Sequence, residues 1–96
     1  MTNIEIVANE VVLNGLMSEE EVMDLIGNFK PLPYMTYQEW RRMGYQVKKG
    51  SKAVIKTKLW KKVSKKDKEN DKVESKFILV PANLFGLNQV ERMAQA

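Results

Sequence analysis

Lysine and tryptophan alternate between Lys52 and Val63, so that every second residue there can contact nucleic acid. These candidate residues are Lys56, Lys58, Trp60 and Lys62. In a β-strand, alternate residues share one face about 7 Å apart, close to the phosphate spacing of an extended single strand. An indole in such a row can stack an unpaired base while lysines contact phosphates, each stack contributing roughly 1–3 kcal/mol. The pattern therefore predicts a surface for single strands, because a duplex hides its base faces.

The two tryptophans have different expected roles. Trp40 falls at helical spacing from Thr36 and Met43, which favours a core position over a ligand contact. Trp60 has two equally supported interpretations. It either stacks bases beside the lysines, or it covers the far edge of a core formed by Ile55, Thr57 and Leu59 on the opposite strand face.

Charge is unevenly distributed along the 96-residue chain. Residues 41–76 hold 14 of the 16 Lys and Arg against 4 acidic residues, a net +10. The remainder is −6, and the whole chain is +4. Such a two-sided distribution orients an incoming polyanion, although a lysine-rich hairpin that serves only solubility has the same composition.

Residue types for catalysis or metal binding are scarce. The sequence has no histidine and no cysteine, which removes the commonest general base and the thiolate metal ligands. Its five glycines form no phosphate-binding loop. We therefore expect no enzymatic activity, no metal and no cofactor. No apolar run spans a bilayer and no signal peptide is visible, so we expect no membrane association and a cytoplasmic location in the host cell.

Helical patterns occupy the first part of the chain. Apolar residues recur at helical spacing from Ile4 to Val11 and from Val22 to Phe29, the latter after a Ser18–Glu21 capping box. Asn14-Gly15 and Pro31-Leu32-Pro33 are typical helix stops. Thr36 and Glu39 form a further capping box, which predicts a short helix ending before Gly44.

Strand patterns dominate the remainder. A short strand is predicted at Tyr45–Val47, then a tight turn around Gly50 and the alternating segment ending at Val63. Ser64–Glu74 is expected to be a mobile hairpin connection. The apolar run Phe77–Val80 predicts an antiparallel partner strand at the centre of the sheet, buried on both sides.

Together these elements predict an α+β fold in one small domain, residues 1–96. The helical part is residues 1–30. Residues 31–96 form a helix and turn, a short antiparallel sheet with a basic β-hairpin, and a short final helix that Asn88 caps and that runs through Met93. The amino-terminal helices are expected to pack on the sheet.

Two stretches resemble a known family, the amino-terminal domain of ArdC-type antirestriction proteins. The first is Thr36-x-x-x-Trp40-x-x-x-Gly44-x-x-Val47-x-Lys49-Gly50-x-Lys52-Ala53, followed by an apolar strand ending Leu59-Trp60-Lys61. The second, Asn83–Glu91, is similar to a closing Val-Phe-Asn-x-x-Gln segment, with Phe85 and Gln89 at the matched positions. Together they cover about the last sixty residues of the chain.

The resemblance implies a small α+β domain that binds single-stranded DNA, as found in plasmid and phage proteins that protect incoming DNA from host nucleases. The basic residues in or beside the matched motif are Arg41, Arg42, Lys48, Lys49 and Lys52. The resemblance makes them candidate DNA contacts. The family's upstream Asn and Tyr-Gly-Asn stretch is missing from residues 1–35. This histidine-free chain also lacks the His-Glu-x-x-His helix of the metallopeptidase-like domain that follows in full-length ArdC.

Two other classes of function fit the same charge pattern. The basic face could bind a host defence nuclease directly, such as a restriction or CRISPR effector, through an acidic patch on that enzyme. Alternatively, the partner is another copy of the chain. The sequence leaves open the choice between DNA and RNA, the oligomeric state and the role of residues 1–29.

Overall fold

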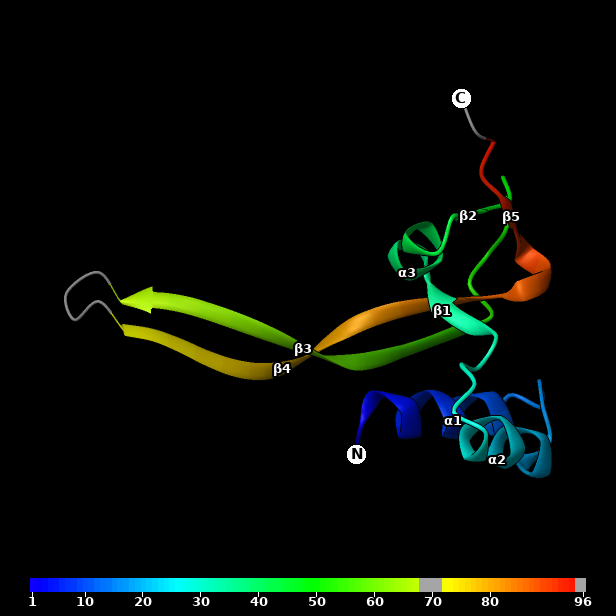
Figure 1. Cartoon of the computed structure of the whole chain (residues 1–96), viewed down its shortest axis with the longest axis horizontal. Coiled ribbons are helices and arrows are strands. Elements are labelled where there is room, and N and C mark those ends of the chain that lie inside the picture. The colour runs from blue at the N-terminus through cyan, green and yellow to red at the C-terminus, as the bar shows by residue number, and fades with distance from the viewer. Residues whose placement is uncertain (68–71, 95–96) are drawn as a thin grey trace.

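A computed structural model describes residues 1–67 and 72–94 of the chain. Helices and strands alternate irregularly, and a long two-stranded ribbon projects from the body (Figure 1). The elements are α1 (Asn3–Leu13), α2 (Glu19–Gly27), β1 (Tyr34–Thr36), α3 (Tyr37–Arg42), β2 (Tyr45–Val47), β3 (Ile55–Asp67), β4 (Lys72–Gly86), the 3-10 helix η1 (Leu87–Gln89) and β5 (Val90–Arg92). The fold is α+β, as predicted.

Side-chain caps begin each of the three α-helices. Ser18 caps α2, and its hydroxyl accepts the backbone N–H of Glu21 at 3.1 Å. Thr36 caps α3 in the same way through the backbone N–H of Glu39. Both caps were predicted. The predicted Ser18–Glu21 box is complete, whereas at Thr36 the structure shows the hydroxyl bond without the reciprocal bond from the Glu39 side chain. A further complete capping box, between Thr2 and Glu5, begins α1 and was missed. Because a cap satisfies backbone donors within four residues, these helix starts depend on local sequence alone.

The strands form two antiparallel sheets. The first has the order β1-β4-β3, so β4 is central, as predicted. β3 and β4 pair from Ile55↔Leu84 to Asp67↔Lys72, while β1 covers only Leu84–Gly86. The second sheet joins β2 to β5. Beyond the short reach of β1, the long hairpin is therefore a two-stranded ribbon.

The core lies where α1 and α2 cover the base of the ribbon (Figure 1). Its buried side chains are Val11, Val22, Leu32, Ile55 and Leu84. Leu59 packs against this cluster from the same strand face as Ile55. The predicted packing of the amino-terminal helices on the sheet is thereby confirmed.

Trp40 is buried, as predicted, with 2% of its side chain exposed. Its indole Nε1 donates to the carbonyl oxygen of Phe85 at 2.9 Å, and its ring contacts Tyr45 edge-on at 5.5 Å between centroids. A buried indole needs a partner for its N–H. This bond joins α3 to the end of β4.

The prediction that Phe77–Val80 is buried on both sides is wrong. Phe77 is 65% exposed, Leu79 46% and Ile78 37%. The physical reason is that the core cluster lies at the base of the ribbon, around Ile55 and Leu84, and includes none of residues 77–80. The strands also run further into the predicted connection Ser64–Glu74 than expected, of which residues 68–71 lie outside the described residues.

Two further predictions are corrected. The chain forms no final α-helix through Met93 in the described part. Instead η1 leads into β5, because pairing with β2 satisfies the backbone of Val90–Arg92. Phe29, predicted on the buried face of the second helix, is 97% exposed. It follows the C-cap residue Asn28 and has a φ of 56°, which turns it away from the helix face.

Within residues 1–67 and 72–94, no helix has the length and apolar character that a membrane crossing requires.

Candidate nucleic-acid interface

The register of β3 and β4 defines two faces of the ribbon. Residues directly opposite each other in an antiparallel pair share a face, and faces alternate along each strand. One face, here called the lysine face, combines residues from both strands. They are Lys56, Lys58, Trp60 and Lys62 of β3, opposite Asn83, Pro81, Leu79 and Phe77 of β4 in that order. The other face holds Ile55, Thr57 and Leu59, and it meets the helices.

The alternation predicted for β3 is confirmed along its first half. Ile55 is 1% exposed, whereas Lys56, Lys58 and Lys62 are all exposed. Two-stranded ribbons twist strongly, and the strands cross over one another in Figure 1. The lysine face therefore winds around the ribbon, and a nucleic-acid strand bound along it would have to follow the same twist.

Trp60 is held in place by Met1 and by Asn3, the first residue of α1. Its side chain is 40% exposed, and its Nε1 donates to the carbonyl oxygen of Met1 at 2.9 Å. Its backbone N–H donates to Oδ1 of Asn3 at 2.8 Å, and its carbonyl oxygen accepts from Nδ2 of the same side chain at 3.1 Å. The indole is thus neither sealed in the core nor free. It is fixed at one edge while much of its surface faces solvent.

Phe77 and Leu79 were missed as members of this face. Leu79 lies directly opposite Trp60, and Phe77 directly opposite Lys62. Trp60 and Phe77 also line one surface hollow together with Thr2 and Asn3. The sequence carried one signal for the exposure of Phe77, because the end of its expected partner strand holds two adjacent lysines, Lys61 and Lys62.

The five basic residues carried over from the family motif lie outside β3 and β4. Arg41 and Arg42 end α3, and the remaining three follow β2. The Arg41 guanidinium lies over the Tyr37 ring at 5.8 Å, and Nζ of Lys48 donates to the carbonyl oxygen of Asn88 at 3.4 Å. Arg41, Arg42, Lys48, Lys49 and Lys52 are all exposed. The structure thus places the predicted site residues in two groups, one around α3 and β2 and one on the lysine face.

The other matched residues of the motif support the framework. Gln89 accepts from the backbone N–H of Gly86 at 2.9 Å and donates to the carbonyl oxygen of Lys52 at 2.6 Å. Gly50 has a φ of 84° in the turn after β2. In this turn the backbone N–H of Ser51 donates a hydrogen bond to the carbonyl oxygen of Lys48 at 3.1 Å. These contacts link the turn carrying the family-motif lysines to the end of β4. The matched Gln89 and Gly50 therefore help to position the turn that carries charged residues.

The charges separate in space as they do in the sequence. The first two helices carry Glu5, Glu10, Glu19, Glu20, Glu21 and Asp24, and no basic residue precedes Lys30. The backbone N–H and the hydroxyl of Thr2 donate to Glu5, and this lowers the pKa of the Glu5 carboxyl. This cap holds the start of α1, from which Met1 and Asn3 reach Trp60. An approaching polyanion would be repelled by the helices and attracted by the ribbon.

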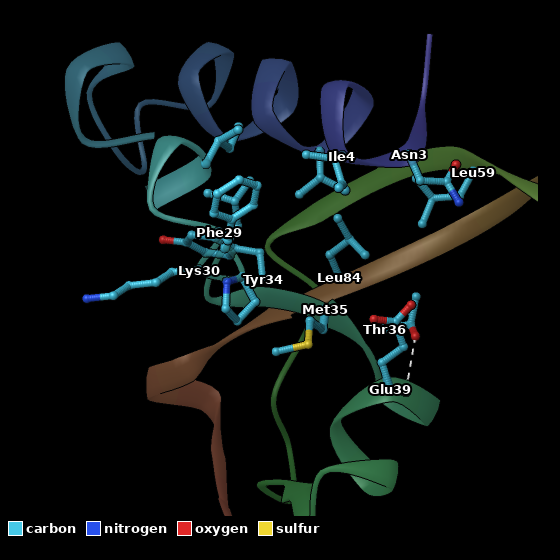
Figure 2. Close-up of a pocket in the computed structure, with 14 residues that line it drawn as sticks. Asn3, Ile4, Phe29, Lys30, Tyr34, Met35, Thr36, Glu39, Leu59 and Leu84 are labelled. Atoms are coloured by element: carbon cyan, nitrogen blue, oxygen red, sulfur yellow. Dashed lines mark hydrogen bonds between the residues drawn. The ribbon is translucent and has the colours of Figure 1, made fainter. Parts of the chain in front are cut away.

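A second hollow lies between the helices and β1 (Figure 2). It is an apolar groove of about 640 Å³, in which Ile4 of α1 and Leu84 of β4 point toward each other. The exposed Phe29 lines it, and Lys30 and Glu39 supply charges at its border. Its lining suits an apolar surface better than a phosphate chain. Within the described part of the chain, no cluster of three or more acidic residues is placed to hold a metal ion.

Comparison with known proteins gives a match to one family model. The family model for the N-terminal domain of anti-restriction factor ArdC matches residues 9–85 of this chain. No curated protein matches the sequence at a significant level. Among solved structures, the chain is similar to the metal-free crystal structure of the antirestriction protein ArdC from plasmid R388, with 19% identity and a TM-score of 0.41. That likeness covers 65% of this chain but only 22% of the ArdC chain.

Proposed function

This chain belongs to the family of the N-terminal domain of anti-restriction factor ArdC, and from that premise we propose that it binds single-stranded DNA without sequence preference. It acts by electrostatic capture and base stacking, and it carries out no catalysis. The role we propose is anti-defence: a bound strand is withheld from host nucleases.

One observation carries this proposal. Lys56, Lys58 and Lys62 share a face of an exposed ribbon with a tryptophan whose side chain is 40% exposed. Lysines alone would attract any polyanion, but an accessible indole adds contact energy only when base faces are open. The combination therefore favours single strands over duplex DNA.

The arginines of α3 and the lysines after β2 extend the proposed surface. They lie near the base of the ribbon, on elements at the opposite side of the sheet from the acidic helices (Figure 1). A strand that leaves the lysine face at that end would meet further positive charge. We propose that this second group contributes phosphate contacts but no stacking.

Fluorescence anisotropy tests the proposal. Labelled single-stranded DNA, duplex DNA and RNA of equal length are titrated with the protein across a salt series. If about five basic side chains contact phosphates, log affinity should fall with log salt at a slope of about −3.5, since each contact contributes about −0.7 on single strands. Tighter binding to the duplex, or a flat salt response, would contradict the proposal.

The runner-up function, direct inhibition of a host nuclease, gives a different result in a pull-down. Tagged protein is incubated with host extract with and without added nuclease. Under the proposed function, co-purifying proteins disappear when nucleic acid is digested. A partner that survives digestion would favour the inhibitor, because its contact with the basic face is then direct.

A further inference from the structure

Resting on the proposed function, we propose that Trp60 and Phe77 form a slot that receives one unpaired nucleobase, with Leu79 beside it. The geometry points to this occupant. Trp60 and Phe77 line the same hollow, and Leu79 lies directly opposite Trp60 on the same face. Phe77 and Leu79 belong to neither the predicted site nor the family motif.

The backbone spacing of the two residues suits a planar ligand between their side chains. Trp60 pairs with Leu79 and Lys62 pairs with Phe77, so Trp60 and Phe77 are diagonal neighbours. Diagonal neighbours in an antiparallel pair lie roughly 7–8 Å apart. A flat ring in van der Waals contact on both faces needs about twice 3.5–4 Å. One base therefore fits between the two side chains.

Exposure makes the slot accessible. The exposed fractions are 65% for Phe77, 46% for Leu79 and 40% for Trp60. Adjacent large apolar side chains that remain exposed mark an interaction surface more often than single scattered ones do. Among the described residues, none of α1 or α2 beyond the start of α1 lines this hollow.

The charges around the slot favour a base over a protein side chain. Lys62 lies directly opposite Phe77, and Lys58 precedes Trp60 by one step of the same face. Lysine is depleted in the centres of protein interfaces, whereas a nucleotide brings its own phosphate to such a cation. The slot thus suits the base of a nucleotide, and the neighbouring lysines suit its phosphate.

The polar groups at the slot are already engaged. The Trp60 Nε1 donates to Met1, the Asn3 carboxamide bonds the Trp60 backbone, and the Thr2 hydroxyl bonds Glu5. Recognition of a particular base needs hydrogen bonds to its edge. We therefore expect the slot to accept any base, in keeping with binding by stacking alone.

Two neighbouring variants test the slot. Phe77→Ala removes one wall, and Ile78→Ala removes an apolar side chain of the same strand from the other face. On single-stranded DNA, Phe77→Ala should weaken binding about 5- to 150-fold, the equivalent of one lost stack, and leave the salt slope unchanged. Ile78→Ala should bind within about twofold of the unaltered protein. Far-UV circular dichroism confirms that both variants fold.

Each outcome separates the slot from the proposed function. If the unaltered protein binds no single strand, the proposed function fails. If it binds with the expected salt slope but Phe77→Ala matches Ile78→Ala, the slot is refuted and the proposed function stands. Loss of a nuclease-resistant protein partner in Phe77→Ala, with nucleic-acid affinity intact, would assign the patch to a protein and also refute the slot.

Tryptophan fluorescence gives a second readout. Trp40 is only 2% exposed, so quenching by added oligothymidine should come from Trp60. Trp60→Phe keeps an aromatic wall and should lose the quenching while affinity changes less than in Phe77→Ala. Oligouridine in a parallel titration distinguishes DNA from RNA as the source of the base. Quenching that survives in Trp60→Phe would overturn the assignment.

Discussion

The side chain of Asn3 pairs with the backbone of Trp60 as a neighbouring strand would. Its carboxamide accepts the Trp60 N–H at 2.8 Å and donates to the Trp60 carbonyl oxygen at 3.1 Å. These groups lie on the edge of β3 that faces away from β4. One residue of α1 therefore holds the edge of β3 at Trp60.

Asn3→Ala should lower the free energy of unfolding by about 1–2 kcal/mol, because two hydrogen bonds between α1 and β3 are lost. Urea denaturation measures the change. Asn9→Ala is the control, since Asn9 is an exposed asparagine of the same helix. It should gain up to about 0.6 kcal/mol from helix propensity. Equal stabilities for the two variants would show that the Asn3 contacts are not formed in solution.

Lys61 and Lys62 are adjacent lysines on opposite faces of the ribbon. If the lysine face binds phosphates, Lys62→Gln should reduce the steepness of the salt dependence by about 0.7, the value for one contact on a single strand. Lys61→Gln, which removes the same charge from the other face, should leave the slope closer to that of the unaltered protein. Anisotropy titrations at several salt concentrations measure both slopes. The same change in both variants would indicate that only overall charge matters.

Trp40 and Trp60 offer a matched pair for stability. Trp40→Phe removes a buried indole and leaves the Phe85 carbonyl oxygen without its donor, so the free energy of unfolding should fall by about 2–3 kcal/mol. Trp60→Phe should cost less than about 1 kcal/mol, because its hydrogen bond to Met1 is exposed. Thermal or urea unfolding measures the stability of both variants and shows which is lower. The reverse order would be incompatible with the core described above.

Phe29 has a left-handed backbone conformation with its side chain in solvent. Phe29→Gly should raise the free energy of unfolding by about 0.5–1 kcal/mol, because glycine adopts a φ of 56° without strain and little buried surface is lost. Phe29→Ala retains the strain and should change stability by less than about 0.5 kcal/mol. If the alanine variant gained as much as the glycine variant, ring exposure rather than backbone strain would be the cause.

The lowered pKa of Glu5 predicts a pH dependence for the start of α1. The charged form of the Glu5 carboxyl is favoured in the folded state. It therefore stabilises the protein at pH values above 4.5, the ordinary pKa of the group, and this stabilisation is lost as the pH falls through the lower pKa of the folded state. Glu5→Gln should be less stable than the unaltered protein at neutral pH, and the difference should shrink below pH 4.5. Urea midpoints between neutral and acidic pH test this. A constant difference would contradict the cap.

Local patterns in the sequence determined the helices, their caps and the alternation in β3. The capping pairs at Ser18 and Thr36 act over three residues, and the alternation of lysine with apolar residues follows the strand period itself. Trp40 was likewise assigned correctly to the core from its helical spacing. Such features need no knowledge of distant contacts.

Tertiary structure alone decided which apolar residues are covered. Phe77–Val80 has the composition of a buried strand, yet its exposure depends on where the amino-terminal helices pack, and their core cluster lies around Ile55 and Leu84. The same applies to Val90–Arg92, which is a strand only because β2 pairs with it. Strand pairing and burial are set by neighbours distant in sequence, and for that reason the aromatic pair on the lysine face became visible only in the folded chain.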